Sequence, residues 1–152
     1  MDICIDEDLI FVDMEFKSDK EALEFLCGKL KKKGYVKDTY KKAVLDREKE
    51  YPTGINFIDY GVAIPHASAE HVNKSTLAVA TLKTPTEFTN IENIEEKVEI
   101  NFICMIALAD KSKQATFLSE LMGTLSDKEK ILEMVKNGNK NLVKDVLNNL
   151  TK

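Results

Sequence analysis

The residues best suited to chemistry lie in the hexapeptide Gly-Val-Ala-Ile-Pro-His, residues 61–66, which contains one of the two histidines of the chain. Proline has a fixed φ and no N–H, so Pro65 predicts the end of a strand and places His66 at the rim of a sheet. A largely neutral imidazole near pH 7 can accept and later release a reactive group. A loop histidine with no special task is the alternative that this hexapeptide alone leaves open.

A second group of polar residues precedes this motif: an Arg-Glu pair at residues 47–48 and Pro-Thr-Gly at residues 52–54. The planar, permanently charged guanidinium of Arg47 matches the oxygens of a phosphate. The separation of 19 positions between residues 47 and 66 (66 − 47) suffices for a helix end, a turn and a short strand. The Thr53 hydroxyl suits a hydrogen bond to a phosphate or to the imidazole, and it equally suits ordinary turn chemistry. Glu48 either pairs with a lysine or lies near the site.

Together these motifs resemble the IIA component of the bacterial sugar phosphotransferase system, in its mannitol/fructose/galactitol branch. The resemblance is sharp over residues 47–72 and looser over nearly the whole chain. It implies that His66 accepts a phosphoryl group on Nε2 and that Arg47 is the active-site arginine. It also implies phospho-HPr as the donor, a IIB domain or protein as the acceptor and, indirectly, a IIC membrane permease, with neither a metal nor an organic cofactor.

Two further residues distinguish this chain from the mannitol- and fructose-type members. Those members carry a second active-site histidine early in the helix that follows the long central strand, where this chain has Gln114, as galactitol-type proteins do. An amide can donate to a phosphate oxygen but cannot carry a proton or a full charge. His71 matches a second histidine of the galactitol-like subgroup, and we expect it to orient His66 or to bind phosphate. For both residues an ordinary surface position remains the alternative.

The same resemblance leaves three functional classes. The first is a phosphocarrier for sugar uptake, with a galactitol-like assignment. The second is a regulatory IIA protein, either of the nitrogen-signalling type or within a transcription regulator, in which phosphorylation of His66 changes partner binding without transport. The third is an α/β binding module in which the Pro-His pair has no catalytic role. The sequence does not specify the sugar, because the sugar contacts belong to the membrane partner.

Composition bounds these classes further. The 152 residues are most simply one domain, 1–152, and 43% hydrophobic with 32% charged residues is typical of a folded globular protein. A net charge of −4 disfavours nucleic acid as the main partner. The basic segment from Lys29 to Lys42 is best interpreted as a solvated helix end.

The cysteines and the apolar runs predict the compartment. Cys4, Cys27 and Cys104 are widely scattered, which indicates reduced packing residues. The acidic N-terminal residues lack the positive charge of a signal peptide, and the longest apolar run is too short to span a bilayer. We therefore expect a cytoplasmic protein with no direct membrane insertion.

The hydrophobic patterns predict strands interleaved with helices, and hence an α/β sandwich of two or three layers. The resemblance implies a mixed, about five-stranded sheet flanked by helices. The sequence predicts strands near Leu9–Met14, Ser75–Leu82 and Val98–Leu108, and a loop over Thr84–Glu96. In the first half of the chain it predicts a helix from a Ser18–Glu21 capping box to Gly34 and a helix from about Asp38 to Glu50. In the second half it predicts a helical stripe over Phe117–Leu125, a helix from a Ser126–Glu129 capping box to Gly138, and a last helix over Leu142–Leu150.

Overall fold

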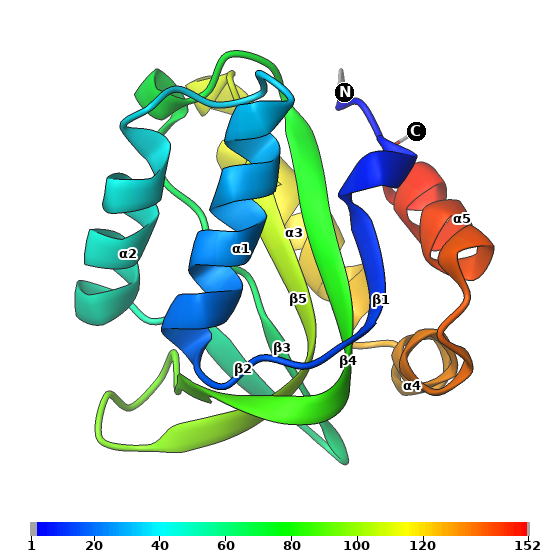
Figure 1. The fold of residues 1–152 in the computed structure, drawn as a ribbon. Helices are drawn as coiled ribbons and strands as arrows, with labels where there is room; N and C mark the ends of the chain where they lie inside the picture. Colours follow the sequence, from blue (N-terminus) through cyan, green and yellow to red (C-terminus); the bar gives the residue numbers. More distant parts are fainter. Residues whose placement is uncertain (1–2, 152) are drawn as a thin grey trace.

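The computed structural model describes residues 3–151, whose strands form one five-stranded sheet (Figure 1). The strands are β1 (Ile10–Met14), β2 (Gly54–Phe57), β3 (Tyr60–Ala63), β4 (Thr76–Thr89) and β5 (Lys97–Ala107). Their order is β1-β4-β5-β3-β2; β1 runs parallel to β4 and β3 parallel to β5, and the other pairs are antiparallel. The expected mixed five-stranded sheet is confirmed.

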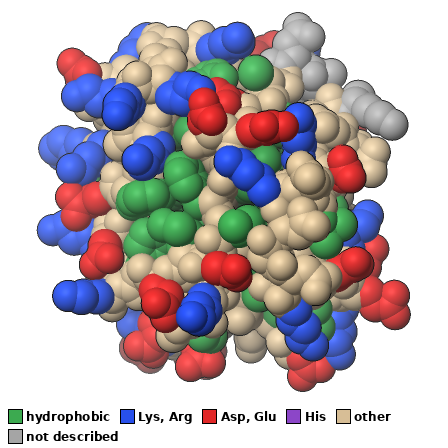
Figure 2. Space-filling view, turned by 45° about the vertical axis from the view of Figure 1, so that its right-hand side comes forward, with side chains coloured by type: hydrophobic (Ala, Val, Ile, Leu, Met, Phe, Trp, Pro, Cys, Tyr) green, Lys and Arg blue, Asp and Glu red, His purple; other side chains and the backbone are tan. Residues whose placement is uncertain are grey.

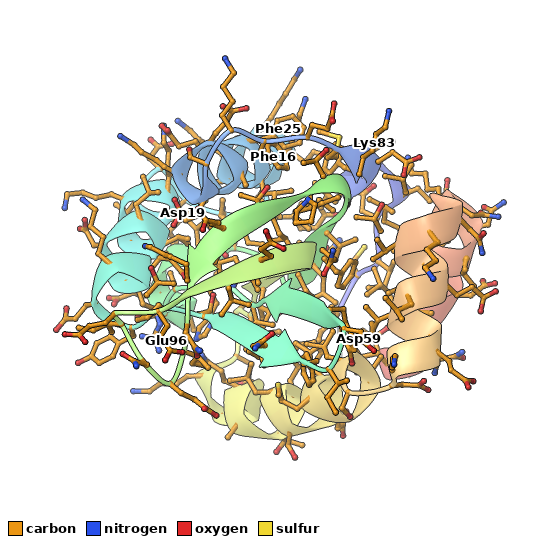
Figure 3. The ribbon with its side chains drawn as sticks, turned by 90° about the horizontal axis from the view of Figure 1, so that it is seen from below. Phe16, Asp19, Phe25, Asp59, Lys83 and Glu96 are labelled. Carbon is orange, nitrogen blue, oxygen red and sulfur yellow. The ribbon has the colours of Figure 1, made fainter. Side chains whose placement is uncertain are left out.

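Helices cover both faces of this sheet and make three layers. They are α1 (Asp19–Lys32), α2 (Tyr40–Glu50), α3 (Gln114–Leu125), α4 (Lys128–Asn137) and α5 (Lys140–Leu150), with short 3₁₀ turns at Glu7–Leu9, Ala69–His71 and Lys111–Lys113. Seen end-on, α1 and α2 lie on one side of the sheet and α3 on the other (Figure 3). The buried residues of α3, α4 and α5 share one core, and those of α1 and α2 share the second.

The central strand β5 separates these two cores because successive side chains of a strand point to opposite faces. Its even-numbered residues 102, 104 and 106 pack with α3, α4 and α5, whereas residues 103, 105 and 107 pack with α1 and α2. All six are almost fully buried. The nearly continuous apolar run that predicted a strand covered on both faces is therefore confirmed.

The serine half of the first predicted capping box is confirmed, and the second predicted box is wrong. Ser18 caps α1, its hydroxyl accepting from the Glu21 N–H at 3.1 Å. Ahead of α4, however, the cap is Asp127, whose carboxylate accepts from the Lys130 N–H. Ser126 still has helical backbone angles and ends α3, so the extended conformation that a cap requires falls one residue later.

The predicted loop over Thr84–Glu96 is also wrong, because β4 continues to Thr89 and only residues 90–96 connect it to β5. The pairing of β4 with β5 shifts register between Thr81 and Thr86, so Pro85 lies in the irregular stretch, where its missing N–H is tolerated. Beyond it, Phe88 pairs with Val98 and is fully buried. Burial of this ring outweighs the polar character of the segment.

The surface carries charges of both signs. On the face drawn in Figure 2, Lys and Arg side chains are interspersed with Asp and Glu, and hydrophobic side chains gather between them. Over the protein as a whole, several charged side chains form exposed ion pairs, such as Lys41 with Glu24 and Lys42 with Asp46. Within residues 3–151, no helix combines the length and the apolar character needed to cross a membrane.

A glycine in β3 sets how closely the strands that position His66 approach. A Cβ built on Gly61 would overlap the carbonyl oxygen of Glu99 in β5. We predict that Gly61→Ala lowers the free energy of unfolding by about 2 kcal/mol or more, because a backbone atom would have to move. The matched control is Gly123→Ala in α3, where a Cβ meets nothing within 4 Å and helix propensity favours alanine by about 1 kcal/mol. Urea unfolding measures both, and equal stabilities would contradict this description of β3.

Candidate phosphoryl-transfer site

His66 lies just beyond the end of β3, as predicted, but it is more enclosed than a residue on an open rim. Its side chain is 8% exposed. The Ile106 N–H of β5 donates to the Pro65 carbonyl at 3.0 Å, so the segment after β3 stays attached to the sheet. The backbone of this segment fixes where the imidazole lies.

One hydrogen bond determines which ring nitrogen of His66 is available. Nδ1 lies 2.8 Å from the carbonyl oxygen of Ile64. A carbonyl oxygen can only accept, so Nδ1 must carry the proton. In the neutral ring Nε2 then has the free lone pair. The side chain therefore presents Nε2 as a nucleophile.

The surroundings of His66 keep the ring neutral. Burial lowers the pKa of His66 below its ordinary value, and the positive charge of Arg47 acts in the same direction. The hydrogen bond to Ile64 opposes them and raises the pKa, without reversing the net shift. A lowered pKa means that Nε2 is unprotonated at neutral pH.

Arg47 lies on α2, exposed to solvent and with its guanidinium 5.7 Å from the centre of the Tyr51 ring. None of the ion pairs found among residues 3–151 involves it. It borders a pocket of about 360 Å³ together with Ser68, Ala69, Glu70, Lys111 and Gln114. Arg47 therefore contributes a positive charge to this pocket, and no carboxylate among the described residues pairs with that charge. Ser68 and Ala69, which follow His66 closely in the chain, border the same pocket.

The sheet topology explains why these distant residues meet. β2 begins directly after the turn that ends α2, and its first residue, Gly54, pairs with Ala63 at the end of β3. The last turn of α2, which carries Arg47, is thereby held beside His66. Because β3 and β5 are parallel, both end at the same edge, and α3 begins there with Gln114. The edge where parallel strands end is the usual place for a site in an α/β sheet.

The pocket combines groups that suit a phosphate-like anion. Arg47 and Lys111 provide positive charge, and Gln114 provides an amide. Glu70 also borders the pocket, but its carboxylate lies 3.8 Å from Nε2 of His71 and its side chain is largely exposed. Sequence reasoning pointed to Arg47 and Gln114, and the structure brings both to one pocket.

Thr53 does not border this pocket. Its hydroxyl and its N–H both donate to the Glu48 carboxylate, at 2.8 and 2.9 Å. Its carbonyl oxygen accepts from the Ile64 N–H at 3.3 Å. Burial raises the pKa of Glu48 to about 7, while these bonds from Thr53 lower it. Thr53 therefore supports the backbone that carries His66, and Glu48 belongs to that support.

His71 also lies outside the pocket. Its Nδ1 is 2.7 Å from the Thr39 hydroxyl, at the start of α2, and its carbonyl oxygen accepts from the Lys37 N–H at 2.9 Å. These contacts attach the turn at residues 69–71 to the segment between α1 and α2. The structure places His71 as an anchor of the loop that follows His66.

Sequence reasoning missed the other four residues that border the pocket, Ser68, Ala69, Glu70 and Lys111. Ser68 lies two positions after His66, so its nearness to the motif was a signal that could have identified it. Lys111 lies 45 residues away (111 − 66), and no local pattern marks it. Only the meeting of β3 and β5 at one edge places it at the pocket.

Comparison with known proteins identifies the family of this chain and several relatives. Residues 3–150 match the family described as "Phosphoenolpyruvate-dependent sugar phosphotransferase system, EIIA 2". The chain is 35% identical over 113 residues to the transcriptional regulator ManR of Bacillus subtilis, covering 74% of this chain but 16% of ManR. It is 27% identical over 112 residues to the galactitol-specific EIIA component of Escherichia coli K12, covering 74% of each. The chain thus spans a small part of ManR and most of the galactitol-specific component.

Solved structures show the same fold. The crystal structure of IIA mannitol from Escherichia coli superposes with a TM-score of 0.74 at 26% identity, covering 93% of this chain and 96% of that one. The nitrogen regulatory protein IIA-Ntr from Neisseria meningitidis superposes with a TM-score of 0.71 at 22% identity, covering 94% and 95%. The second likeness concerns the fold alone.

The environment of His66 predicts how it titrates. By NMR, we expect its pKa below the ordinary histidine value of about 6.5, because burial and Arg47 both disfavour the imidazolium. Arg47→Ala should raise the pKa, since a positive charge is removed, whereas Arg47→Lys should keep it low. A wild-type His66 that titrates at or above 6.5 would contradict the geometry described here.

Proposed function

We propose that this chain, which belongs to the EIIA type 2 family of the phosphoenolpyruvate-dependent sugar phosphotransferase system, is a phosphocarrier that accepts a phosphoryl group on His66 and passes it on. The observation that carries the proposal is the hydrogen bond between Nδ1 of His66 and the Ile64 carbonyl oxygen, which leaves Nε2 as the nucleophile. The positively charged pocket beside Arg47 supports it.

The proposed transfer uses the lone pair of Nε2. This lone pair attacks the phosphorus of a phosphohistidine donor; the new N–P bond forms while the bond to the donor nitrogen breaks. The ring then carries a positive charge, and Nδ1–H still donates to Ile64, which stabilises the charged form. No proton has to leave the ring in either direction. The low pKa of free His66 favours the neutral ring before transfer, and the bond to Ile64 favours the charged ring after it. Because the two effects oppose each other, they favour a transfer step that is reversible.

In this proposal the pocket holds the transferred group; His66 does not itself border the pocket, but Ser68, two residues later, does. Arg47 and Lys111 balance the charge that spreads over the phosphoryl oxygens during transfer, and Gln114 donates from its amide. Thr53 and His71 act indirectly in this proposal: one supports the backbone of Ile64 and the other anchors the loop after His66.

The proposal takes its partners from the family. Phospho-HPr is the donor, a IIB domain or protein is the acceptor, and a IIC permease is coupled indirectly. One structural relative is the complex of enzyme IIA mannitol and phosphorylated enzyme IIB mannitol from Escherichia coli, at 24% identity and a TM-score of 0.78. It covers 96% of this chain and 99% of that one. The proposal retains the cytoplasmic location expected from the sequence.

Within this function we propose a galactitol-like sugar system. Gln114 stands where mannitol- and fructose-type members have a histidine, and the chain covers 74% of the galactitol-specific component of Escherichia coli. An amide in the pocket keeps the phosphoryl group bound without adding a second titrating group.

A regulatory role is the second candidate, because the chain is more similar in sequence to the regulator ManR than to the galactitol-specific component, at 35% against 27% identity. Deleting the gene and measuring both sugar uptake and transcription distinguishes the two. Loss of galactitol uptake supports transport. Unchanged uptake with altered transcription supports regulation by phosphorylation of His66.

The acceptor residue is tested by removing each histidine in turn. With enzyme I, HPr and labelled phosphoenolpyruvate, we expect His66→Ala to abolish labelling, because no other nucleophile lies in the same position. His71→Ala is the matched control and should still be labelled, since His71 contacts Thr39 outside the pocket. Undiminished acid-labile phosphate on His66→Ala would refute the assignment.

The role of Arg47 is tested by a change that keeps its charge. Arg47→Lys loses the two-pronged geometry, so we expect transfer from phospho-HPr to slow by about ten- to a hundredfold. Lys49→Ala is the control, because Lys49 lies on the same helix but borders a different groove. Quench-flow measurement of phosphoryl transfer gives both rates, and a wild-type rate for Arg47→Lys would assign the arginine to the helix surface.

A further inference from the structure

A line of hydrogen bonds connects the buried carboxylate of Glu48 to the imidazole of His66. The carboxylate accepts from the N–H and the hydroxyl of Thr53, one bond to each oxygen. The carbonyl oxygen of Thr53 accepts from the Ile64 N–H, and the carbonyl oxygen of Ile64 accepts from Nδ1 of His66. In each link the donor and acceptor atoms are 3.3 Å apart or closer.

The helix explains why adjacent residues have different tasks. Successive residues of an α-helix point about 100° apart. Arg47 therefore borders the solvent-exposed pocket while Glu48, the next residue, is 8% exposed and turned towards the turn that begins β2. A buried carboxylate is costly unless its oxygens are hydrogen-bonded, and both oxygens of Glu48 are bonded to Thr53.

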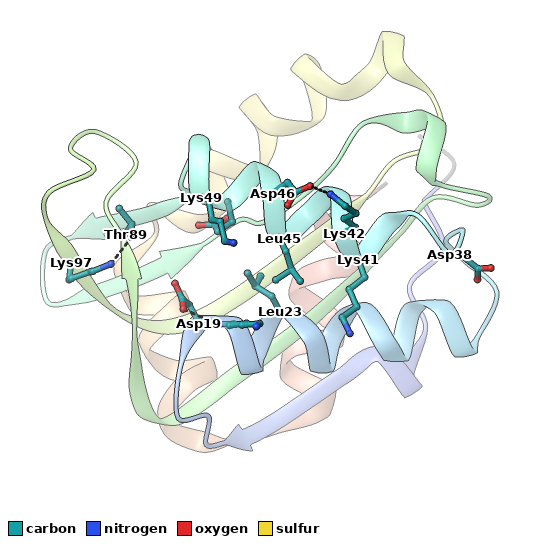
Figure 4. A pocket seen from close by; sticks show the side chains of 12 residues that line it. Asp19, Leu23, Asp38, Lys41, Lys42, Leu45, Asp46, Lys49, Thr89 and Lys97 are labelled. Atoms are coloured by element: carbon teal, nitrogen blue, oxygen red, sulfur yellow. Dashed lines mark hydrogen bonds and ion pairs between the residues drawn. The ribbon is translucent and has the colours of Figure 1, made fainter.

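Lysines near Glu48 do not account for its position. Glu48 borders a groove of about 600 Å³ between α1, α2 and the ends of β4 and β5, and Lys20, Lys41 and Lys49 border the same groove (Figure 4). None of the ion pairs found among residues 3–151 involves Glu48. The charges that act on it, Asp19 and Arg47, are weaker influences than burial and the bonds from Thr53.

We propose that Glu48 is a positioning residue for His66: it fixes Thr53, and through Thr53 and Ile64 it holds the imidazole with the proton on Nδ1 and the lone pair on Nε2. Two independent segments meet in this arrangement, the end of α2 and the end of β3. Without the carboxylate, the turn at residues 51–53 keeps only backbone bonds, from the Tyr51 N–H to the Arg47 carbonyl and from the Ile64 N–H to the Thr53 carbonyl. The Ile64 carbonyl then loses its fixed orientation towards the ring. The proposal rests on the proposed function only in naming Nε2 as the nucleophile.

The test compares four substitutions, two at Glu48 and two at Thr53, the residues joined by the first link. Glu48→Ala removes both bonds to Thr53. Glu48→Gln is the conservative variant, because its amide oxygen accepts from the Thr53 N–H and its NH₂ donates to the Thr53 hydroxyl. Thr53→Val removes one bond and keeps the shape of the side chain. Thr53→Ser is its matched control, since the hydroxyl is retained.

Two measurements are made on each variant. The ¹⁵N chemical shifts of the His66 imidazole report which nitrogen carries the proton, and the rate of phosphoryl transfer from phospho-HPr reports the effect on reaction. We expect Glu48→Ala and Thr53→Val to lose the fixed Nδ1–H form and to slow transfer by about ten- to a hundredfold. Glu48→Gln and Thr53→Ser should keep the Nδ1–H form and rates close to wild type.

Opposite results overturn the proposal. If folded Thr53→Val or Glu48→Ala retains the Nδ1–H form, Glu48 does not position the ring, whatever the rate. Thr53→Val keeps the backbone bond and supplies the test should Glu48→Ala fail to fold. The imidazole spectrum needs no phosphoryl donor, so it decides the role of Glu48 even if wild-type protein accepts no phosphate, a result that would refute the proposed function alone.

Discussion

The hydrogen bond between Nδ1 of His66 and the carbonyl oxygen of Ile64 is the interaction on which the rest of the site depends. It makes one nitrogen a permanent donor and leaves the other as the nucleophile. The bond joins residues that are only two positions apart, but it forms only where the backbone holds the Ile64 carbonyl in a fixed orientation. The Ile106 N–H holds the Pro65 carbonyl and Thr53 holds the Ile64 N–H, so neighbours on both sides of β3 provide that backbone.

Charge and burial act together on this arrangement. A buried imidazole beside an arginine is less basic than one in water, so the unprotonated ring is available at neutral pH. The same arginine is attracted to a phosphoryl group once it arrives, and Lys111 reinforces it. The site therefore disfavours a proton on Nε2 and, in the proposed function, would favour a phosphoryl group there.

The sequence predicted the parts of this protein that depend on local chemistry. Pro65 marks the end of β3, Ser18 caps α1, and the apolar run of β5 gives the central strand. It failed where tertiary contacts outweigh local preference. Burial of Phe88 extends β4 past Pro85, and the helical backbone of Ser126 moves the cap of α4 to the next residue.

The candidate site shows the same division. Motif and spacing identified Arg47, His66 and Gln114, which the fold brings to one edge of the sheet. The partner of Glu48 could not be read from the sequence, because a lysine partner and a position near the site were both open. Only the fold at the end of α2 brings Thr53 against the carboxylate. Lys111 reaches the pocket through the pairing of β3 with β5, which no local pattern encodes.

In the proposed phosphorylated form, Nε2 of His66 carries the phosphoryl group while Nδ1 remains bonded to Ile64. Phosphorylating ¹⁵N-histidine-labelled protein with enzyme I, HPr and phosphoenolpyruvate, and recording ³¹P and long-range ¹H–¹⁵N spectra, tests it most directly. We expect one phosphohistidine, at His66, with phosphorus bonded to Nε2 and a proton retained on Nδ1. Phosphorus on Nδ1, phosphate on His71 or no phosphohistidine at all would contradict it.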